Sequence, residues 1–120
     1  MTTVLLVEDE ADVRELIVEA FAEHALEVRC AENDQRAYEL LQEGARDFSV
    51  LVADINLGAG TTGFDVARKA RQLNRNLKVI YITGHAAHLN RFGVEGAVMF
   101  PKPFNPHELA QEILAMTGEA

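Results

Sequence analysis

The sequence predicts an α/β domain in which one parallel sheet is covered by helices on both faces. Five short runs of apolar and β-branched residues alternate along the chain with segments of helical periodicity. This alternation implies right-handed crossovers between parallel strands. The run from Val50 is apolar until it ends in Asp54, as expected for a strand buried on both faces of such a sheet. A chain of 120 residues without repeats or linkers is long enough for one core, so we expect a single domain over residues 1–120 with no output domain.

The expected strands are short apolar runs bounded by turn-forming or charged residues. They are Thr3–Val7, Leu26–Cys30, Ser49–Asp54, Leu77–Thr83 and Ala97–Phe100. Pro101 follows the fifth run and has no N–H for a ladder hydrogen bond, which fits the edge of a sheet better than its middle. The fifth strand is an edge in the flavodoxin-like order 2-1-3-4-5, and we expect this doubly wound (βα)5 arrangement.

The first expected helix, residues 11–25, has apolar side chains at a spacing of three and four residues. We expect this stripe to face the core, and it consists of Val13, Leu16, Ile17, Ala20 and Phe21. The stripe expected on the exposed side consists of Ala11, Arg14, Val18 and Ala22.

The next two helices are recognised by their ends. Asn33 can cap a helix that continues to about Glu43, and Gly44 follows it as a stop signal. A third helix is expected over residues 64–73, after a glycine-rich loop.

The last two helices differ in the strength of their signals. Residues 85–92 make only about two turns and include weak helix formers, so we expect this fourth helix to be short or frayed. The last helix has a strong start signal, because Asn105 can cap it, Pro106 occupies its first position and Glu108 lies three residues after the cap.

The composition indicates the compartment and excludes some partners. Cys30 is the only cysteine, and no apolar run reaches the roughly 18 residues of a membrane span or forms a signal peptide. We therefore expect a cytoplasmic protein without a membrane partner. The net charge of −8 argues against nucleic acid as a partner, because binding to phosphates requires clustered Lys and Arg. Residues 1–60 carry four basic and fourteen acidic side chains, whereas residues 61–120 carry seven and five.

Polar residues follow several of the expected strands at the points where they end. They are Glu8 and Asp9 after the first strand, Asp54 at the end of the third, Thr83 at the end of the fourth and Lys102 after the fifth. Carboxyl ends of parallel strands meet at one edge of a sheet, where ligands bind in open α/β folds. Three carboxylates that lie close together repel one another unless a cation neutralises them, and oxygen ligands suit Mg²⁺. For any one of these residues, a helix cap or a simple ion pair is an alternative explanation.

This set of residue types suits phosphoryl transfer to aspartate. A carboxylate can act as the nucleophile, while a divalent ion and a lysine neutralise the charge on the transferred phosphoryl oxygens. Lys102 would be this lysine, and Thr83 would supply a hydroxyl donor.

Four short blocks resemble the signature of a known family. They are Val7-Glu8-Asp9-Glu10, Val52-Ala53-Asp54, Ile82-Thr83-Gly84 and Lys102-Pro103-Phe104. In this order and at the ends of these strands, they resemble the response-regulator receiver domain of two-component signalling. The resemblance extends over essentially the whole chain.

The resemblance implies a role for each matched residue. Asp54 would be the phosphoacceptor, Thr83 the switch hydroxyl and Lys102 the lysine that pairs with the phosphoryl group. The Mg²⁺ ligands would be Asp9, Asp54 and the backbone carbonyl of Asn56, with Glu8 holding metal-bound water. The Lys102–Pro103 bond would be cis.

The resemblance also implies partners and limits the activity. A histidine kinase or histidine phosphotransfer protein would dock on the first helix, at Arg14, Val18 and Ala22, and a further protein would receive the signal. The chain would be no enzyme beyond self-phosphorylation and self-dephosphorylation.

The chain departs from the family pattern at three places. Leu57-Gly58 replaces the usual Met-Pro after the phosphoacceptor, and the following glycine, Gly63, arrives one residue late. The stretch between Thr83 and Lys102 is about one helical turn shorter than usual, and Met99 occupies a position that is commonly aromatic. The last two departures fall on the face through which receivers usually signal.

Two other functions are consistent with parts of the sequence. Gly58, Gly60 and Gly63 form a G-x-G-x-x-G pattern, which raises the hypothesis of a nucleotide-binding enzyme. This pattern lies in the third βα unit, is separated from its strand by Ile55, Asn56 and Leu57, and lacks an acid about twenty residues further on. The second alternative is a receiver-like interaction module that acts without phosphorylation.

Overall fold

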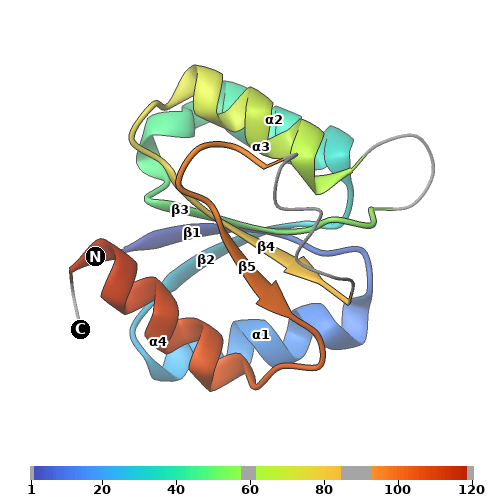
Figure 1. Ribbon diagram of the computed structural model, residues 1–120, viewed down its shortest axis with the longest axis vertical. Coiled ribbons are helices and arrows are strands. Elements are labelled where there is room, and N and C mark those ends of the chain that lie inside the picture. The colour runs from blue at the N-terminus through green and yellow to red at the C-terminus, as the bar shows by residue number, and fades with distance from the viewer. Residues whose placement is uncertain (1, 58–61, 85–92, 119–120) are drawn as a thin grey trace.

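A computed structural model describes residues 2–57, 62–84 and 93–118. Five strands form one parallel sheet with the order β2-β1-β3-β4-β5 (Figure 1), which confirms the expected flavodoxin-like topology. The strands are β1 (Thr3–Val7), β2 (Glu27–Ala31), β3 (Val50–Asp54), β4 (Lys78–Thr83) and β5 (Val98–Pro101). The helices are α1 (Ala11–Glu23), α2 (Asp34–Gly44), α3 (Gly63–Leu73) and α4 (Pro106–Thr117), with a short 3₁₀ turn, η1 (Ala45–Asp47), after α2. The expected fourth helix, residues 85–92, lies outside the described residues.

Helices cover both faces of the sheet, with α2 and α3 on one side and α1 and α4 on the other (Figure 1). Alternate residues of each central strand point to opposite faces, so the sheet separates two apolar clusters. In β3, Leu51 and Ala53 pack with α2 and α3, whereas Val50 and Val52 pack with α1 and α4. Burial on both faces explains why β3 reads as a continuous apolar run in the sequence.

The parallel register brings the carboxyl ends of the strands to one edge of the sheet. Val7 pairs with Ala53, and Asp54 pairs with Ile82 in the next strand. Thr83 pairs with Pro101, and the N–H of Lys102 donates to the Thr83 carbonyl at 2.8 Å. The expectation that proline marks an edge strand is confirmed, because within the described part of the chain β5 is the last strand of the sheet and pairs with β4 alone.

Most helix ends follow the signals in the sequence. The Asn33 side chain accepts from the Arg36 N–H at 2.8 Å, and the Asn105 side chain accepts from the His107 N–H at the same distance. The start of α3 uses a capping box that the sequence reading did not identify, formed by Thr62 and Asp65. Among the described helices, none is long and apolar enough to cross a membrane.

The expected orientation of α1 is wrong for Leu16. Ile17, Ala20 and Phe21 are buried as expected, but Leu16 is 58% exposed. Successive residues are rotated by about 100° around a helix, and the buried face of α1 is turned toward Phe21 relative to the predicted one. Leu16 therefore emerges on one flank of the buried face, while Val18 on the other flank is half-buried against the core.

Candidate functional site

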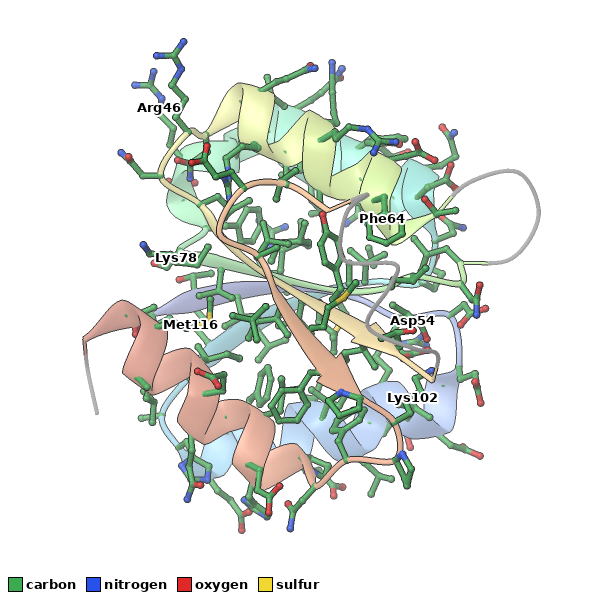
Figure 2. All side chains as sticks on the ribbon, in the orientation of Figure 1. Arg46, Asp54, Phe64, Lys78, Lys102 and Met116 are labelled. Atoms are coloured by element: carbon green, nitrogen blue, oxygen red, sulfur yellow. The ribbon has the colours of Figure 1, made fainter. Side chains whose placement is uncertain are left out.

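Asp54 is the last residue of β3 and lies at the carboxyl edge of the sheet, where it is 3% exposed. One carboxylate oxygen, Oδ2, accepts a hydrogen bond from Nζ of Lys102 at 2.7 Å. The other, Oδ1, accepts from the backbone N–H of Asn56 at 2.9 Å. Figure 2 shows Asp54 and Lys102 together at the ends of their strands. These two bonds fix the orientation of the Asp54 carboxylate.

Lys102 directly follows β5, and its bond to Pro103 is cis, as expected. Burial alone would lower the pKa of Lys102, but the hydrogen bond and the negative charge of Asp54 outweigh it, so the pKa is raised. Lys102 is therefore positively charged at neutral pH. A fixed ammonium group beside Asp54 can stabilise further negative charge that is added to this carboxylate.

Glu8 is a fully buried carboxyl group in the same region. Its Oε2 accepts from the backbone N–H of Glu10 at 3.1 Å, and no described group pairs with its Oε1. Burial raises the pKa of Glu8 to about 7; the Glu10 N–H opposes this shift, and the nearby Asp54 and Asp9 add to it. A buried carboxyl oxygen without a partner, next to other acids, fits a site for a divalent cation.

Asp9 and Glu10 complete a group of three acids with Glu8. One carboxylate oxygen from each lies within 4.8 Å of the others, and both Asp9 and Glu10 are exposed to solvent. Hard cations such as Mg²⁺ prefer oxygen ligands and keep several waters, which an exposed group of carboxylates allows. Glu10 was not among the predicted ligands, although the run of three acids in the sequence contained the signal.

The structure places the other predicted site residues as follows. Thr83 ends β4 at the same edge and is 5% exposed. Apart from its chain neighbours, no described atom lies within 4 Å of a Cβ built on Gly84, the residue after Thr83. The N–H of Asn56 donates to the Asp54 carboxylate. An isolated antiparallel β-bridge also joins Asn56 to Thr62, the residue before α3. The role of its carbonyl as a metal ligand stays a prediction.

Gly63 supports the position of Asp54, and the sequence reading missed this role. A Cβ on Gly63 would lie 2.4 Å from the backbone oxygen of Asp54 and 3.2 Å from Cα of Ile55. The N–H of Gly63 donates to the Ile55 carbonyl at 3.0 Å. The first turn of α3 is thus packed directly against the backbone that carries Asp54, at a distance that only glycine allows.

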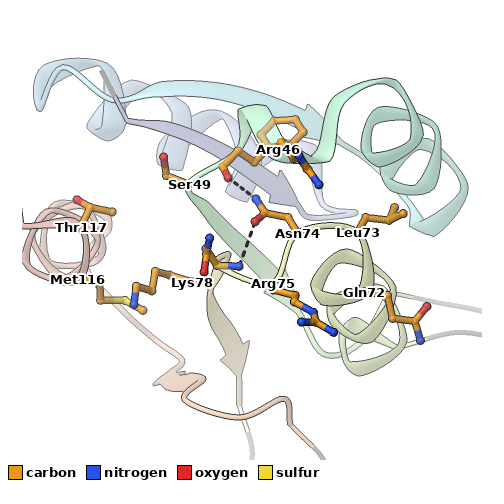
Figure 3. Close-up of a pocket in the computed structure, with 11 residues that line it drawn as sticks. Arg46, Ser49, Gln72, Leu73, Asn74, Arg75, Lys78, Met116 and Thr117 are labelled. Atoms are coloured by element: carbon orange, nitrogen blue, oxygen red, sulfur yellow. Dashed lines mark hydrogen bonds between the residues drawn. The ribbon is translucent and has the colours of Figure 1, made fainter.

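A large cavity of about 760 Å³ lies at the opposite, amino edge of the sheet (Figure 3). Asn74 organises one side of it, since its amide donates to the Phe48 carbonyl and its oxygen accepts from the Asn76 N–H, each at 3.1 Å. Arg46 follows α2 and Arg75 follows α3, where positive charge is favoured by the helix dipoles. The cavity contains none of the residues predicted to act at the carboxyl edge.

A parallel five-stranded sheet with a buried aspartate, a paired lysine and an acidic group at one edge defines a class of doubly wound signalling domains. The chain belongs to the response regulator receiver domain family, whose model matches residues 4–114. The family is that of the receiver domains of two-component signalling.

The chain is similar to the response regulator receiver protein CpdR of Brucella abortus (strain 2308), with 34% identity over 97% of each protein. It spans about half the length of other curated relatives that it matches. A receiver protein from Sinorhizobium medicae WSM419 has a similar structure, with a TM-score of 0.84 at 30% identity over 95% of this chain and 94% of that one. TrrA of Thermotoga maritima, solved in complex with Mg²⁺-BeF, has a TM-score of 0.80 at 26% identity over 97% of this chain and 99% of that one.

Proposed function

We propose that the chain accepts a phosphoryl group on Asp54 from a histidine kinase or a histidine phosphotransfer protein, and signals by a change of conformation. The observation that carries this proposal is the hydrogen-bonded position of the Asp54 carboxylate between Lys102 and the Asn56 N–H. An exposed, unrestrained acid would be a poor nucleophile for an in-line reaction, whereas this one is held at the edge of the sheet.

In the reaction, a carboxylate oxygen of Asp54 attacks the phosphorus atom of the donor. A P–O bond to Asp54 forms, and the bond between phosphorus and the donor histidine nitrogen breaks, so that its electron pair returns to the imidazole ring. Before the transfer, the ammonium group of Lys102 pairs with Asp54. After the transfer, this group would move to the phosphoryl oxygens, which carry the added negative charge.

We propose Mg²⁺ as the cofactor, held by Asp9, Asp54 and the Asn56 carbonyl, with Glu8 binding a water of the ion. When bound, the ion would neutralise charge on the acids and on the transferring phosphoryl group. The buried Glu8 oxygen without a described partner supports this assignment. Thr83 is proposed as the hydroxyl that moves toward the phosphoryl group, because it lies at the same edge of the sheet as Asp54.

The test is incubation of the protein with acetyl phosphate, followed by intact-mass and peptide mass spectrometry. We expect one phosphoryl adduct on Asp54 with Mg²⁺, and at least a tenfold lower yield when EDTA removes the ion. Incubation with ATP provides the comparison for the nucleotide-binding alternative. Binding of ATP without any adduct from acetyl phosphate would contradict the proposal, and the absence of both would favour a module that acts without phosphorylation.

The donor protein needs a docking surface beside Asp54, and α1 offers an apolar groove there. The groove has a volume of about 410 Å³. It is lined by Glu10, Val13, Leu16, Ile17, Lys102, Pro103, Phe104 and Pro106. We propose that apolar side chains of the donor fill this groove around the exposed Leu16.

The residues first predicted for docking lie on the other flank of α1. Arg14 is half-buried, and its guanidinium donates to the Glu8 carbonyl at 2.8 Å, so part of its hydrogen bonding is used within the chain. Val18 is half-buried and Ala22 is exposed. Docking through Arg14, Val18 and Ala22 therefore stays an alternative to docking at Leu16. Substitutions on each flank of α1 can distinguish the two.

Replacement of Leu16 by glutamate is expected to lower the rate of phosphotransfer from the cognate kinase at least tenfold, because a charge enters the apolar groove. Phosphorylation by acetyl phosphate should stay at the wild-type rate. Leu73→Glu is the matched control, since Leu73 is also a large exposed hydrophobic residue, at the end of α3. A wild-type rate for Leu16→Glu with a slow rate for Val18→Glu would move the docking surface to the other flank of α1.

A further inference from the structure

Two histidines and a glutamate form a surface cluster where α1 meets α4. His24 caps the carboxyl end of α1, and His107 is the second residue of α4. Nε2 of His24 lies 3.2 Å from Nδ1 of His107, and the ring planes are tilted by 54°. Nε2 of His107, on the other side of the ring, lies 3.3 Å from Oε2 of Glu23. None of these residues belongs to the site around Asp54 or lines the groove at Leu16.

The separation of the two facing nitrogens matches that of two ligands on one metal ion. Zinc binds imidazole nitrogen at about 2.0–2.1 Å with tetrahedral geometry, which places two such nitrogens about 3.3 Å apart. The distance of 3.2 Å in the structure is close to this value. An ion can therefore be accommodated by rotation of the half-buried His24 and the exposed His107 side chains, without movement of the helices.

Glu23 adds the feature that distinguishes a metal-binding histidine from a simple pair. Histidines that bind metal through one ring nitrogen commonly donate the N–H of the other nitrogen to a carboxylate, which fixes the tautomer and the ring orientation. The contact of Glu23 with Nε2 of His107 leaves Nδ1 without a proton when the ring is neutral, and thus available as a ligand.

We propose that His24 and His107 bind a divalent transition-metal ion of the zinc type, with Glu23 orienting His107. The ion takes the place of the proton between the two rings. His24 in its neutral form then carries its own proton on Nδ1, which leaves Nε2 free to bind the ion. Water or a side chain from a bound protein completes the coordination. The ion links the end of α1 to the start of α4 and stabilises the folded chain.

The experiment is a titration of the whole chain with ZnCl₂ at pH 7.5, with excess Mg²⁺ present to occupy the acids at the carboxyl edge. Isothermal calorimetry and thermal unfolding are both recorded. We expect one zinc ion per chain and a rise in Tm of several degrees, because a ligand that binds only the folded state stabilises it. His24→Ala and His107→Ala should each weaken zinc binding at least tenfold and remove the rise in Tm. Glu23→Gln should retain binding with an affinity about tenfold lower.

The chain offers a matched control in its other two histidines, His85 and His88. The double variant His85→Ala/His88→Ala should bind zinc like the wild type. Circular dichroism and the Mg²⁺ response of each variant confirm that it is folded. A zinc response that persists in His24→Ala and His107→Ala, or the absence of saturable binding in the wild type, would overturn the proposal and leave a hydrogen-bonded histidine pair.

Discussion

Asp54→Asn is expected to abolish phosphoryl uptake from acetyl phosphate, to below the detection limit of intact-mass spectrometry. An amide oxygen is a poor nucleophile compared with a carboxylate, and the amide cannot form the acyl phosphate. The variant should remain folded, because asparagine has nearly the same shape and its oxygen can still accept from the Asn56 N–H. Lys102 loses its closest anion but keeps the favourable charges of Glu8 and Glu10 nearby.

Asp47→Asn is the matched control for this prediction. Asp47 is an exposed acid in the 3₁₀ turn η1, at the opposite edge of the sheet. Its replacement removes the same charge but should leave the yield and rate of the adduct unchanged. A full adduct on Asp54→Asn, mapped to a peptide containing Asp9, would show that another carboxylate of the edge is the acceptor.

The sheet could be predicted from the sequence because its strands are buried on both faces. The continuous apolar run of β3 and the positions of Asp54, Thr83 and Pro101 at strand ends depend on local chemistry that the sequence displays directly. Parallel pairing then brings these ends to one edge, so the contact between Asp54 and Lys102 could also be anticipated.

Leu16 illustrates what periodicity leaves undetermined. An apolar stripe indicates that a helix is amphipathic, but its width does not show where the buried face is centred. In α1 the contacts with the sheet and α4 favour Ile17 and Phe21, and Leu16 is left on the surface. The error is informative, because the misplaced residue is the one around which we propose that the donor protein docks.

The burial of single side chains and close contacts between backbone segments could not be predicted from the sequence either. The run Glu8-Asp9-Glu10 gives no indication that Glu8 is fully buried while its two neighbours are exposed. In the sequence, Gly63 stood out only as part of a G-x-G-x-x-G pattern without its usual context and as a family glycine that arrives one residue late, whereas the structure packs it directly against the backbone of Asp54.

Gly63→Ala is expected to destabilise the protein by about 2–3 kcal/mol, the usual range for overpacking, and to lower Tm by roughly 10 °C. At the first position of a helix, alanine is normally the better residue, by up to about 1 kcal/mol. Here the new Cβ would lie 2.4 Å from the Asp54 oxygen and 3.0 Å from its carbonyl carbon, both backbone atoms that cannot rotate away. Either α3 moves outward and loses core contacts of Phe64 and Val66, or the end of β3 moves and displaces Asp54.

Gly84→Ala is the matched control, because a Cβ there meets no described atom within 4 Å. Its free energy of unfolding should stay within about 0.5 kcal/mol of the wild type. Urea unfolding gives the stability of both variants, and the rate of adduct formation with acetyl phosphate gives the position of Asp54. Gly63→Ala should slow this reaction as well as destabilise the fold, because the two effects have one cause. A Gly63→Ala variant as stable as Gly84→Ala would mean that α3 can move away at little cost, and that the contact with Asp54 does not hold the carboxylate in place.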